Sequence, residues 1–580
     1  MQSNVIYTEK NECQECCKCV RNCPVKAIRI INHSAQIDYD RCIACGTCVQ
    51  VCPAGAQRVR NDVNRVKMLF DLKEKVILSV APSFVSEFDN PKKLLAKAKK
   101  AGFYAVSETA LGADIVSYFQ KRKMKEDNSL MFSTACPVTV DYIQKYNPEY
   151  IKFLSPYLSP LLTHCLFLKS FYGEEIGIVF AGPCIAKKKE SDLYPEYLDV
   201  ALTFDELRGF FEEIEITEDE LENSKVDFEP YRSISGVIYP IEGGMLQTLS
   251  EYDLKDASYI NEGYFSLSGF KEIMCLLEKE DLSTLSQTFC EFLACKGGCI
   301  NGSGLKNKGD IISRKKKVVA YYKNVRSGTN KKLDLSTSNL KKPPLYDKRF
   351  SDPVKKSHFS QEEKDTVLKK IGMFSKEDML DCGGCGYDTC EEFAEACLSG
   401  LAEPDMCVIN MKRLAQDKLN TLIKTLPLGV VIVDEKMNII ECNAKFVEMF
   451  VGIEADEKVI SRFKGRNISK FVETGNVALK TFEVGKLKTV IRSGQKIFEV
   501  YSFAINKEMI GMIFQDITKL AVKREMIVKK AEEVIQKNLQ VVQKIAFLLG
   551  ENAAEAEVIL NSLIEAINTS EGENGKDRGS

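Results

Sequence analysis

Two runs of cysteine near the N-terminus constrain this chain more than any other feature of its sequence. Each run has the form Cys-x2-Cys-x2-Cys-x3-Cys-Pro, the first ending at Pro24 and the second at Pro53. In folds built on two such runs, the fourth Cys of each run ligates the cluster of the other run. We therefore expect two 4Fe–4S clusters, one on Cys13, Cys16, Cys19 and Cys52 and the other on Cys42, Cys45, Cys48 and Cys23.

These runs resemble the bacterial two-cluster ferredoxins, and the resemblance covers residues 1–65. We expect short strands between the runs, at 27–31 and 35–37, and assign no ligand role to Cys17. A zinc ribbon is the alternative, although four-cysteine runs with a trailing proline rarely bind zinc.

The composition supports iron–sulfur chemistry in a reducing compartment. The 580 residues include 22 cysteines but only three histidines, His33, His164 and His358. Such a balance favours iron–sulfur clusters or all-cysteine zinc sites over His-rich metal sites and over disulfides. The formal net charge of −2 gives no electrostatic basis for binding nucleic acid. With no basic leader and no long apolar run, we expect a cytoplasmic protein without a membrane span.

From about residue 75 the pattern changes to strands that alternate with helices. Strands are expected at 75–80, 130–132 and 176–180, and helices at 91–101 and 110–124. The chain is therefore expected to be multidomain, combining α/β and α+β parts, with a parallel sheet in this region. Ligands of such sheets gather at the carboxyl ends of the strands.

Four cysteines of this region form a candidate cluster site. Cys136 and Cys184 each follow an expected strand, and Cys295 and Cys299 lie in a Gly-rich segment. Four thiolates are the number that a cubane cluster needs. For Cys295 and Cys299 alone, a Gly-rich turn with two buried thiols is the alternative.

The segments Thr134–Pro137, Pro183–Glu190 and Glu291–Gly302 resemble, in the same order, the three signature loops of the iron-only (FeFe) hydrogenases. The resemblance implies a catalytic domain over 75–310 that holds an H-cluster. In this cofactor, a 4Fe–4S cubane is joined to a two-iron subsite that carries CO, cyanide and a bridging amine dithiolate. The implied cubane ligands are Cys136, Cys184, Cys295 and Cys299, with Cys299 as the bridge.

The same resemblance implies roles for two further side chains. Lys187 would hydrogen-bond one cyanide, which suits its compact ammonium, and Ser83 after Pro82 would lie near the other cyanide. A solvated basic run at 187–189 is the alternative for Lys187.

This sequence departs from the family along the route that carries protons to the cluster. Ala135 stands where the family has a cysteine, and alanine cannot carry a proton. The two relay carboxylates are replaced by Gln120 and Lys123, whereas Ser155 keeps the family's serine. Because general acid–base relays contribute roughly 10²–10⁴-fold in rate, we expect slow H2 chemistry. Two packing methionines of the family are also replaced, by Gly182 and Leu293.

Residues 311–375 are Lys-rich and contain Pro343-Pro344, which predicts a linker. Residues 376–413 then carry the spacing Cys-x2-Cys-x4-Cys-x16-Cys, with Asp388 or Thr389 as the expected cap of a helix over 390–398. The motif resembles the 4Fe–4S motif of corrinoid iron–sulfur proteins and implies one further cluster; zinc is the alternative. Its expected ligands are Cys382, Cys385, Cys390 and Cys407.

Residues 414–520 resemble a PAS sensor domain, with a helix before the first strand and a β-hairpin at the end. No histidine follows His358, so a His-ligated haem is excluded there, whereas flavin or an empty pocket stays open. Residues 521–570 predict a helical hairpin, with apolar positions from Ile527 and Asn538 at a seam position. Its apolar face could pack on the PAS domain or form a homodimer.

Three functions fit this domain order, which resembles the sensory branch of the iron-only hydrogenases. The first is an H2 sensor whose clusters pass their redox state to the PAS domain. Since only about 60 residues follow that domain, we expect a signalling kinase or phosphatase to act in trans. The second is a catalytic hydrogenase that exchanges electrons with ferredoxin. The third is a non-enzymatic iron–sulfur assembly or electron-transfer protein. Ala135 and the PAS domain favour the first, and Lys187 argues against the third.

Overall fold

The computed structural model describes most of the chain as two compact units. The first comprises Met1–Leu368 and Met379–Glu403, and the second comprises Lys369–Asp378 and Pro404–Ser580. The predicted helical hairpin over 521–570, with Ile527 and Asn538, lies outside the described residues except for Ser562. The residues that the structure describes are Ser562 and residues 4–518 except 33, 128, 218, 221–225, 252–262, 280, 281, 283, 284, 286, 287, 306–308, 328–332, 334, 336–339, 346–351, 356, 475, 476 and 495.

The N-terminal residues form a small module of paired strands and two short helices. β1 pairs with β4 and β2 with β3, all antiparallel, so the strands expected between the cysteine runs are confirmed. Each helix begins inside a cysteine run, after Cys17 or Gly46, whose φ angles of 55° and 78° turn the chain sharply. The elements are β1 (Ile6–Thr8), α1 (Lys18–Asn22), β2 (Ile28–Ile31), β3 (Ser34–Ile37), α2 (Thr47–Val51) and β4 (Gln57–Val59).

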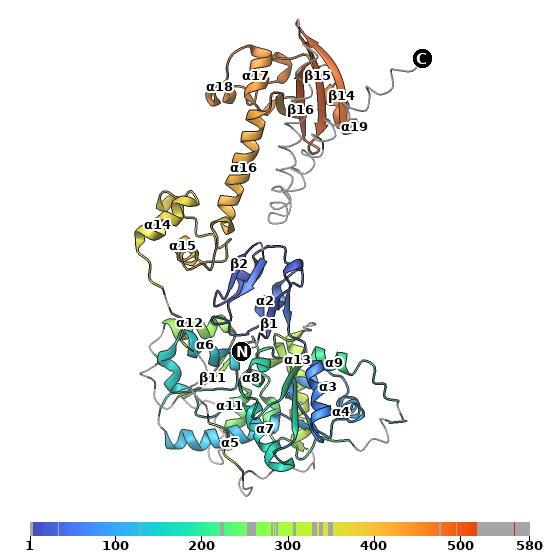
Figure 1. Ribbon diagram of the computed structural model, residues 1–580, viewed down its shortest axis with the longest axis vertical. Helices are drawn as coiled ribbons and strands as arrows, with labels where there is room; N and C mark the ends of the chain where they lie inside the picture. The colour runs from blue at the N-terminus through green and yellow to red at the C-terminus, as the bar shows by residue number, and fades with distance from the viewer. Residues whose placement is uncertain are drawn as a thin grey trace. The chain divides into compact units, whose positions relative to one another are not determined.

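Two parallel sheets form the framework of the region after this module (Figure 1). The four-stranded sheet has the order β6-β5-β8-β9, and the three-stranded sheet has the order β10-β11-β7. The parallel sheet is therefore confirmed, but the expected strand at 130–132 lies in the second sheet, where β7 pairs with β11. The strands are β5 (Val76–Val80), β6 (Ala105–Glu108), β7 (Met131–Phe132), β8 (Gly177–Gly182), β9 (Val200–Thr203), β10 (Tyr264–Ser268) and β11 (Phe289–Leu293).

Helices bury these sheets. Every residue of β5 and β8 is buried, which accounts for their continuous apolar sequences, because parallel strands are covered on both faces. The helices expected at 91–101 and 110–124 are confirmed. The helical elements are α3 (Val63–Leu72), η2 (Pro82–Ser86), α4 (Pro91–Lys100), α5 (Ala110–Glu126), α6 (Pro137–Tyr146), η3 (Pro148–Phe153), α7 (Pro160–Tyr172), α8 (Ala186–Leu193), α9 (Phe204–Phe210), η4 (Gly236–Ile238), α11 (Gly244–Glu251), α12 (Phe270–Lys279) and η6 (Cys299–Asn301).

The segment 311–375, predicted to be a linker, begins instead with a packed helix, α13 (Ile311–Ser327). Val318, Tyr322 and Val325 of this helix are buried. These positions recur at three- and four-residue spacings, so one face packs while the lysines occupy the others. A second helix, α14 (Gln361–Lys370), lies near the end of the segment.

The last part of the first unit contains α15 (Cys390–Leu398). Thr389 caps this helix by accepting a hydrogen bond from the backbone N–H of Glu392, and the Glu392 side chain completes a capping box. Of the two expected caps, Thr389 is therefore the one that the structure uses.

The second unit consists of a long helix, α16 (Val408–Thr425), followed by a five-stranded antiparallel sheet of order β13-β12-β16-β15-β14 (Figure 1). Three aromatic rings, those of Phe446, Phe498 and Phe514, lie 4.6–5.0 Å from the ring of Phe450 and fill part of the interior. The polar strand β14 was not expected from the sequence. The elements are β12 (Gly429–Asp434), β13 (Ile439–Cys442), α17 (Ala444–Val451), α18 (Glu457–Ser461), α19 (Val477–Val484), β14 (Lys486–Ser493), β15 (Lys496–Ala504) and β16 (Met509–Asp516).

Candidate functional site

Three loops bring cysteine thiols together after parallel strands. Cys136 follows β7 and precedes α6, Cys184 follows β8, and Cys299 begins η6 after β11. Cys136 interacts electrostatically with both other thiols, and Cys184 with Cys299, so the three share one site. Burial, followed by this mutual repulsion, raises the pKa of Cys184 to about 11 and raises that of Cys299 further.

This group of thiols suits a metal cluster. Neighbouring thiolates repel one another in a buried site, so they can lose their protons together only when a cationic group such as iron compensates their charge. Backbone N–H groups of Ala186 and Lys187 also hydrogen-bond Cys184. The fourth predicted ligand, Cys295, lies at the start of the same turn as Cys299, and its carbonyl accepts a hydrogen bond from Gly298 at 2.9 Å. The structure thus gathers Cys136, Cys184 and Cys299, with Cys295 in the adjoining turn.

Glycines allow the third loop to approach its neighbours closely. Gly298 has a φ of 102°, and a Cβ there would lie 2.2 Å from the carbonyl oxygen of Pro240. A Cβ on Gly302 would lie 2.3 Å from the carbonyl oxygen of Pro183, the residue before Cys184. A larger residue at position 302 would therefore separate the second and third loops, and one at position 298 would push the third loop away from Pro240.

Lys187 lies beside the gathered thiols. Its charge acts on Cys184 and Cys299 and favours their thiolate forms. Its Nζ is 2.6 Å from Oε2 of Glu190, and both residues are buried. Sequence reasoning did not anticipate Glu190 as this partner, although its position three residues later on α8 is a normal spacing for helical ion pairs.

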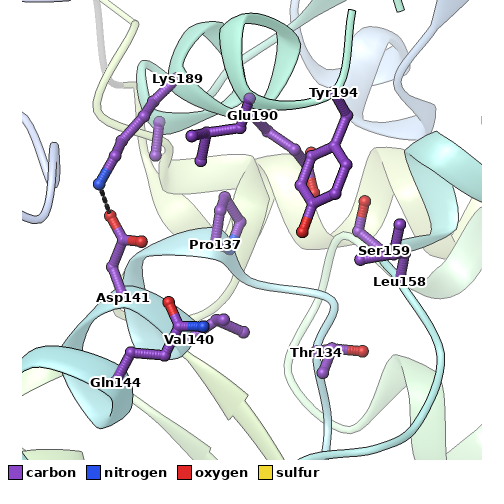
Figure 2. Close-up of a pocket in the computed structure, with 12 residues that line it drawn as sticks. Thr134, Pro137, Val140, Asp141, Gln144, Leu158, Ser159, Lys189, Glu190 and Tyr194 are labelled. Atoms are coloured by element: carbon purple, nitrogen blue, oxygen red, sulfur yellow. Dashed lines mark hydrogen bonds and ion pairs between the residues drawn. The ribbon is translucent and has the colours of Figure 1, made fainter. Parts of the chain in front are cut away.

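The alternative of a solvated basic run at 187–189 is wrong. Lys188 is fully buried, with its Nζ 2.9 Å from Asp62 and 2.8 Å from Glu206. Lys189 forms an ion pair with Asp141 of α6 across a small pocket, which Figure 2 shows together with Glu190. Each of the three lysines therefore has an acidic partner.

Ser83 lies in η2, which packs against η6 and so against the turn that begins with Cys299. Its Oγ is buried and, among the residues that the structure describes, has no hydrogen-bond partner. Buried hydroxyls are normally hydrogen-bonded, so this one fits a site completed by a bound polar group.

The two packing methionines of the family have different replacements here. A Cβ on Gly182 would lie 2.4 Å from the ring of Phe180, so this ring occupies the space beside Gly182. Leu293 is buried at the end of β11.

The structure connects two of the positions predicted from the family's proton relay. Ser155 donates a hydrogen bond from its Oγ to Oε1 of Gln120 at 2.6 Å, and both residues are buried. Lys123, about one turn further along α5, is partly exposed and pairs with Asp127 at 2.9 Å. Ala135 lies in the first loop, directly before Cys136. Gln120 therefore presents an amide, Ala135 an alkyl group and Lys123 a surface ammonium. None of the three is a thiol or a carboxyl that titrates near neutral pH.

In the N-terminal module, the last cysteine of the first run lies near cysteines of the second run. Cys23 interacts electrostatically with Cys45 and Cys42 of the second run, whereas Cys19 interacts with Cys13 and other cysteines of the first. Burial, followed by the neighbouring thiol of Cys45, raises the pKa of Cys23 to about 12.

Backbone amides point at several of these sulfurs. N–H groups of Ala27, Ala35 and Ala44 donate to the Sγ atoms of Cys23, Cys13 and Cys42 at 3.2, 3.4 and 3.4 Å, respectively. Cys16 and Cys48 lie in the first and second runs, and Cys52 caps the C-terminus of α2.

The four cysteines of the further motif do not all belong to one unit. Cys382, Cys385 and Cys390 belong to the first unit, and Cys407 caps the N-terminus of α16 in the second. The backbone N–H of Cys390 donates to Oδ1 of Asp381 at 2.6 Å. Binding of one cluster by all four thiols stays a prediction.

No helix in the described part of the chain is both long enough and apolar enough to cross a membrane. Among the same residues, no three His, Cys, Asp or Glu side chains converge on a point that would hold one metal ion.

Family comparisons agree with the domain order. Residues 74–303 match the family described as iron only hydrogenase large subunit, C-terminal domain. Residues 35–58 match a 4Fe-4S binding domain, residues 378–409 match an Fe-S cluster family and residues 417–476 match a PAS domain. The predicted resemblance to iron-only hydrogenases, with added iron–sulfur and PAS segments, is confirmed.

Individual relatives include hydrogenases and iron–sulfur assembly proteins. Iron hydrogenase 1 of Clostridium pasteurianum is 24% identical over 303 residues, which cover 42% of this chain and 52% of that protein. Cytosolic iron-sulfur assembly component 3 of Rattus norvegicus is 24% identical over 318 residues, which cover 43% of this chain and 67% of that protein. The chain therefore spans about half of the clostridial relative and about two thirds of the rat relative.

A solved structure, the apo [FeFe]-hydrogenase HydA1 of Chlamydomonas reinhardtii, overlaps 45% of this chain and 88% of its own, with 17% identity and a TM-score of 0.36. The family matches define the class of this protein as a hydrogenase-like iron–sulfur protein with a PAS domain.

Proposed function

We propose that this protein is an H2 sensor: a hydrogenase-like site reacts slowly with H2 and its redox state is passed through iron–sulfur clusters toward the PAS domain. One observation carries the proposal. The thiols of Cys136, Cys184 and Cys299 gather beside Lys187, and Ala135 and Gln120 stand at the positions that the resemblance predicts for the proton relay. The site keeps its cluster-binding side chains and lacks the groups that support fast turnover.

When bound, the H-cluster would supply reversible cleavage of H2 into protons and electrons. The residues that would hold its cubane are Cys136, Cys184, Cys295 and Cys299. Lys187 and the unpartnered Ser83 hydroxyl would hydrogen-bond the small ligands of the two-iron subsite. In the site, the buried carboxylate of Glu190 forms an ion pair with Lys187.

This chain differs from the iron-only hydrogenases in the side chains along the predicted proton route. The Ser155 hydroxyl and the Gln120 amide form a hydrogen bond, but an amide oxygen does not take up and release protons at neutral pH. Ala135, directly before Cys136, has no group that could take up a proton at the predicted start of the relay. Slow exchange of protons suits a sensor, because a sensor needs H2 to occupy the site and does not need rapid turnover.

The signal would leave through the second unit. Cys407, an expected cluster ligand, caps α16, and the other end of α16 leads into the PAS sheet. A change at Cys407 could therefore act on the PAS domain through one continuous helix. A signalling kinase or phosphatase would respond in trans, and the PAS and C-terminal segments could form a homodimer.

Infrared spectroscopy of the full chain, matured with the diiron cofactor, tests the proposal. We expect CO and cyanide bands that shift under H2 relative to argon, and loss of these bands in Cys299→Ala. A protein that retains its iron–sulfur clusters but shows no such bands after maturation would contradict the proposal.

Two other functions remain candidates. The similarity to cytosolic iron-sulfur assembly component 3 favours a non-catalytic role in iron–sulfur assembly or electron transfer. That role predicts intact iron–sulfur absorption without CO and cyanide bands. An ordinary ferredoxin-linked hydrogenase predicts bands together with fast turnover, which the side chains at positions 135 and 120 disfavour.

A further inference from the structure

The motif around Cys385 docks on the N-terminal module through one arginine. Arg21 of α1 donates from Nη1 to the carbonyl oxygen of Gly384 at 3.1 Å. Its Nη2 donates to the carbonyl oxygen of Cys16 at 2.9 Å. Arg21 therefore joins the loop that carries one expected cluster ligand, Cys16, to the loop that carries another, Cys385.

Two further residues hold the same contact. Lys26 donates from Nζ to the carbonyl oxygen of Gly386, and its ammonium lies 5.4 Å from the centre of the Tyr387 ring. Tyr387 is buried. A Cβ on Gly386 would lie 2.8 Å from Cα of Arg21, so the two backbones are in contact at this point.

The opposite side of the N-terminal module faces the hydrogenase-like site. A Cβ on Gly46, next to Cys45, would lie 2.6 Å from Ile185 and 2.7 Å from Ser303. Ile185 follows Cys184 directly, and Ser303 follows Gly302 at the end of the third loop. The module therefore contacts both the loops of the hydrogenase-like site and the Cys385 loop.

We propose that Arg21 is a positioning residue that fixes the distance between the first-run cluster of the N-terminal module and the cluster at Cys382, Cys385 and Cys390, so that electrons pass between them. This proposal rests on the cluster assignments made under the proposed function. In each transfer, the first-run cluster is oxidised by one electron and the cluster at Cys385 is reduced by one. No bond forms or breaks. The electron comes from H2 in the proposed sensor, or from dithionite in the test below.

An arginine suits this task better than a lysine. Its planar guanidinium presents several N–H donors in fixed directions, so it can donate to two carbonyls on separate loops at once. A lysine ammonium carries the same charge on a single nitrogen at the end of a flexible stem. The carbonyls of Cys16 and Gly384 would then not be held by one rigid group.

Electron paramagnetic resonance of the full chain, reconstituted with iron and sulfide and reduced with dithionite, tests the proposal. Magnetic coupling between the two clusters should broaden the wild-type spectrum, and Cys385→Ala should show the spectrum without this coupling. We expect Arg21→Ala to lose at least half of the coupling at unchanged iron content, with a smaller loss in Arg21→Lys. Arg29→Ala is the matched control, because Arg29 lies in the same module and pairs loosely with Asp38 at 3.6 Å.

Full coupling in Arg21→Ala, or its absence in the wild type, would overturn the proposal. If Arg21→Ala loses iron, Gly386→Ala decides, since its added Cβ displaces the loop while the Arg21 side chain remains. Lost coupling in Gly386→Ala supports the proposal, and retained coupling overturns it. Dithionite reduces the clusters without H2, so these outcomes do not depend on the infrared test of the proposed function.

Discussion

Ser155 donates a hydrogen bond to Gln120 across 2.6 Å inside the hydrogenase-like domain. Both residues are buried, and each stands at a position predicted from the proton relay of the iron-only hydrogenases. Two predicted relay positions are thus joined by a hydrogen bond, and neither carries a thiol or a carboxyl. This relationship underlies the proposal of slow chemistry.

Restoring the missing groups should accelerate H2 chemistry. The double variant Ala135→Cys, Gln120→Glu returns a thiol and a carboxyl to two relay positions. We expect H2 production from a reduced dye to rise roughly 10²-fold, the lower end of what general acid–base groups contribute. The assay needs protein matured with the diiron cofactor.

The control for this gain is Ser155. Adding Ser155→Ala to the double variant removes the hydroxyl between the restored groups and the rest of the route, so most of the gain should disappear. An unchanged rate in the double variant, with CO and cyanide bands present, would show that protons do not limit turnover.

The three consecutive lysines should differ sharply in their effects on stability. Lys188→Ala leaves the carboxylates of Asp62 and Glu206 buried without their shared cation, at a cost of about 3–5 kcal/mol. Lys189→Ala is the matched control, because its ion pair with Asp141 is partly exposed and contributes at most about 1 kcal/mol. Thermal unfolding followed by loss of iron–sulfur absorption measures both. Equal unfolding temperatures for the two variants would contradict this account.

His164 should make the folded protein sensitive to acid. Burial lowers its pKa from 6.5 to about 3, and its ring nitrogens contact Ser79 and Ser107 at 2.9 and 3.0 Å. Below pH 6.5 the unfolded chain binds a proton at this residue that the folded chain does not bind. Its contribution to stability therefore falls as the pH drops from 6.5 toward 3, by roughly 1.4 kcal/mol per pH unit.

The measurement compares wild type and His164→Gln, because other groups and the clusters respond to acid in both proteins. Unfolding temperatures between pH 7.5 and pH 5 should decline less in His164→Gln, whatever its stability at pH 7.5. Parallel declines would mean that His164 does not contribute to the acid response.

Asn443 should hold the end of α16 on the PAS domain. Its Nδ2 donates to the carbonyls of Ile423 and Leu428 at 2.8 Å, and its Oδ1 accepts from the backbone N–H groups of Val430 and Phe446 at 2.9 Å. Asn443→Ala leaves these groups without their partner, at about 1–3 kcal/mol for each that stays buried.

Amide hydrogen exchange checks this attachment. The last turn of α16 should exchange faster in Asn443→Ala than in wild type, whereas Asn467→Ala, which removes an exposed cap of a short turn, should leave it unchanged. Unchanged exchange in Asn443→Ala would mean that the helix end is held by other contacts.

Local sequence patterns predicted much of this molecule. The strands that lead to Cys136 and Cys184, the cap at Thr389 and the strands of the PAS hairpin follow from apolar runs and capping residues. Counting along the family's relay predicted Gln120 and Ser155 as relay positions, and this stays a prediction; their hydrogen bond is visible only in the structure.

Contacts between residues far apart in the sequence could not be predicted from local patterns. The helix α13 was taken for part of a linker because the segment 311–375 is Lys-rich and contains Pro343-Pro344. Lys188 pairs with Asp62 and Glu206, which lie on other elements. No local sequence pattern connects Lys188 to these two carboxylates. Strand β7 was assigned to a parallel sheet correctly, but its pairing with β11, far along the chain, has no local signal.

Exposure of the full chain to H2 tests the central claim most directly. Protein matured with the diiron cofactor and oxidised beforehand is placed under H2, and electron paramagnetic resonance follows reduction of its iron–sulfur clusters. The account predicts slow reduction of the clusters in wild type and none in Cys299→Ser. Clusters that stay oxidised under H2 in wild type, although dithionite reduces them, would contradict it.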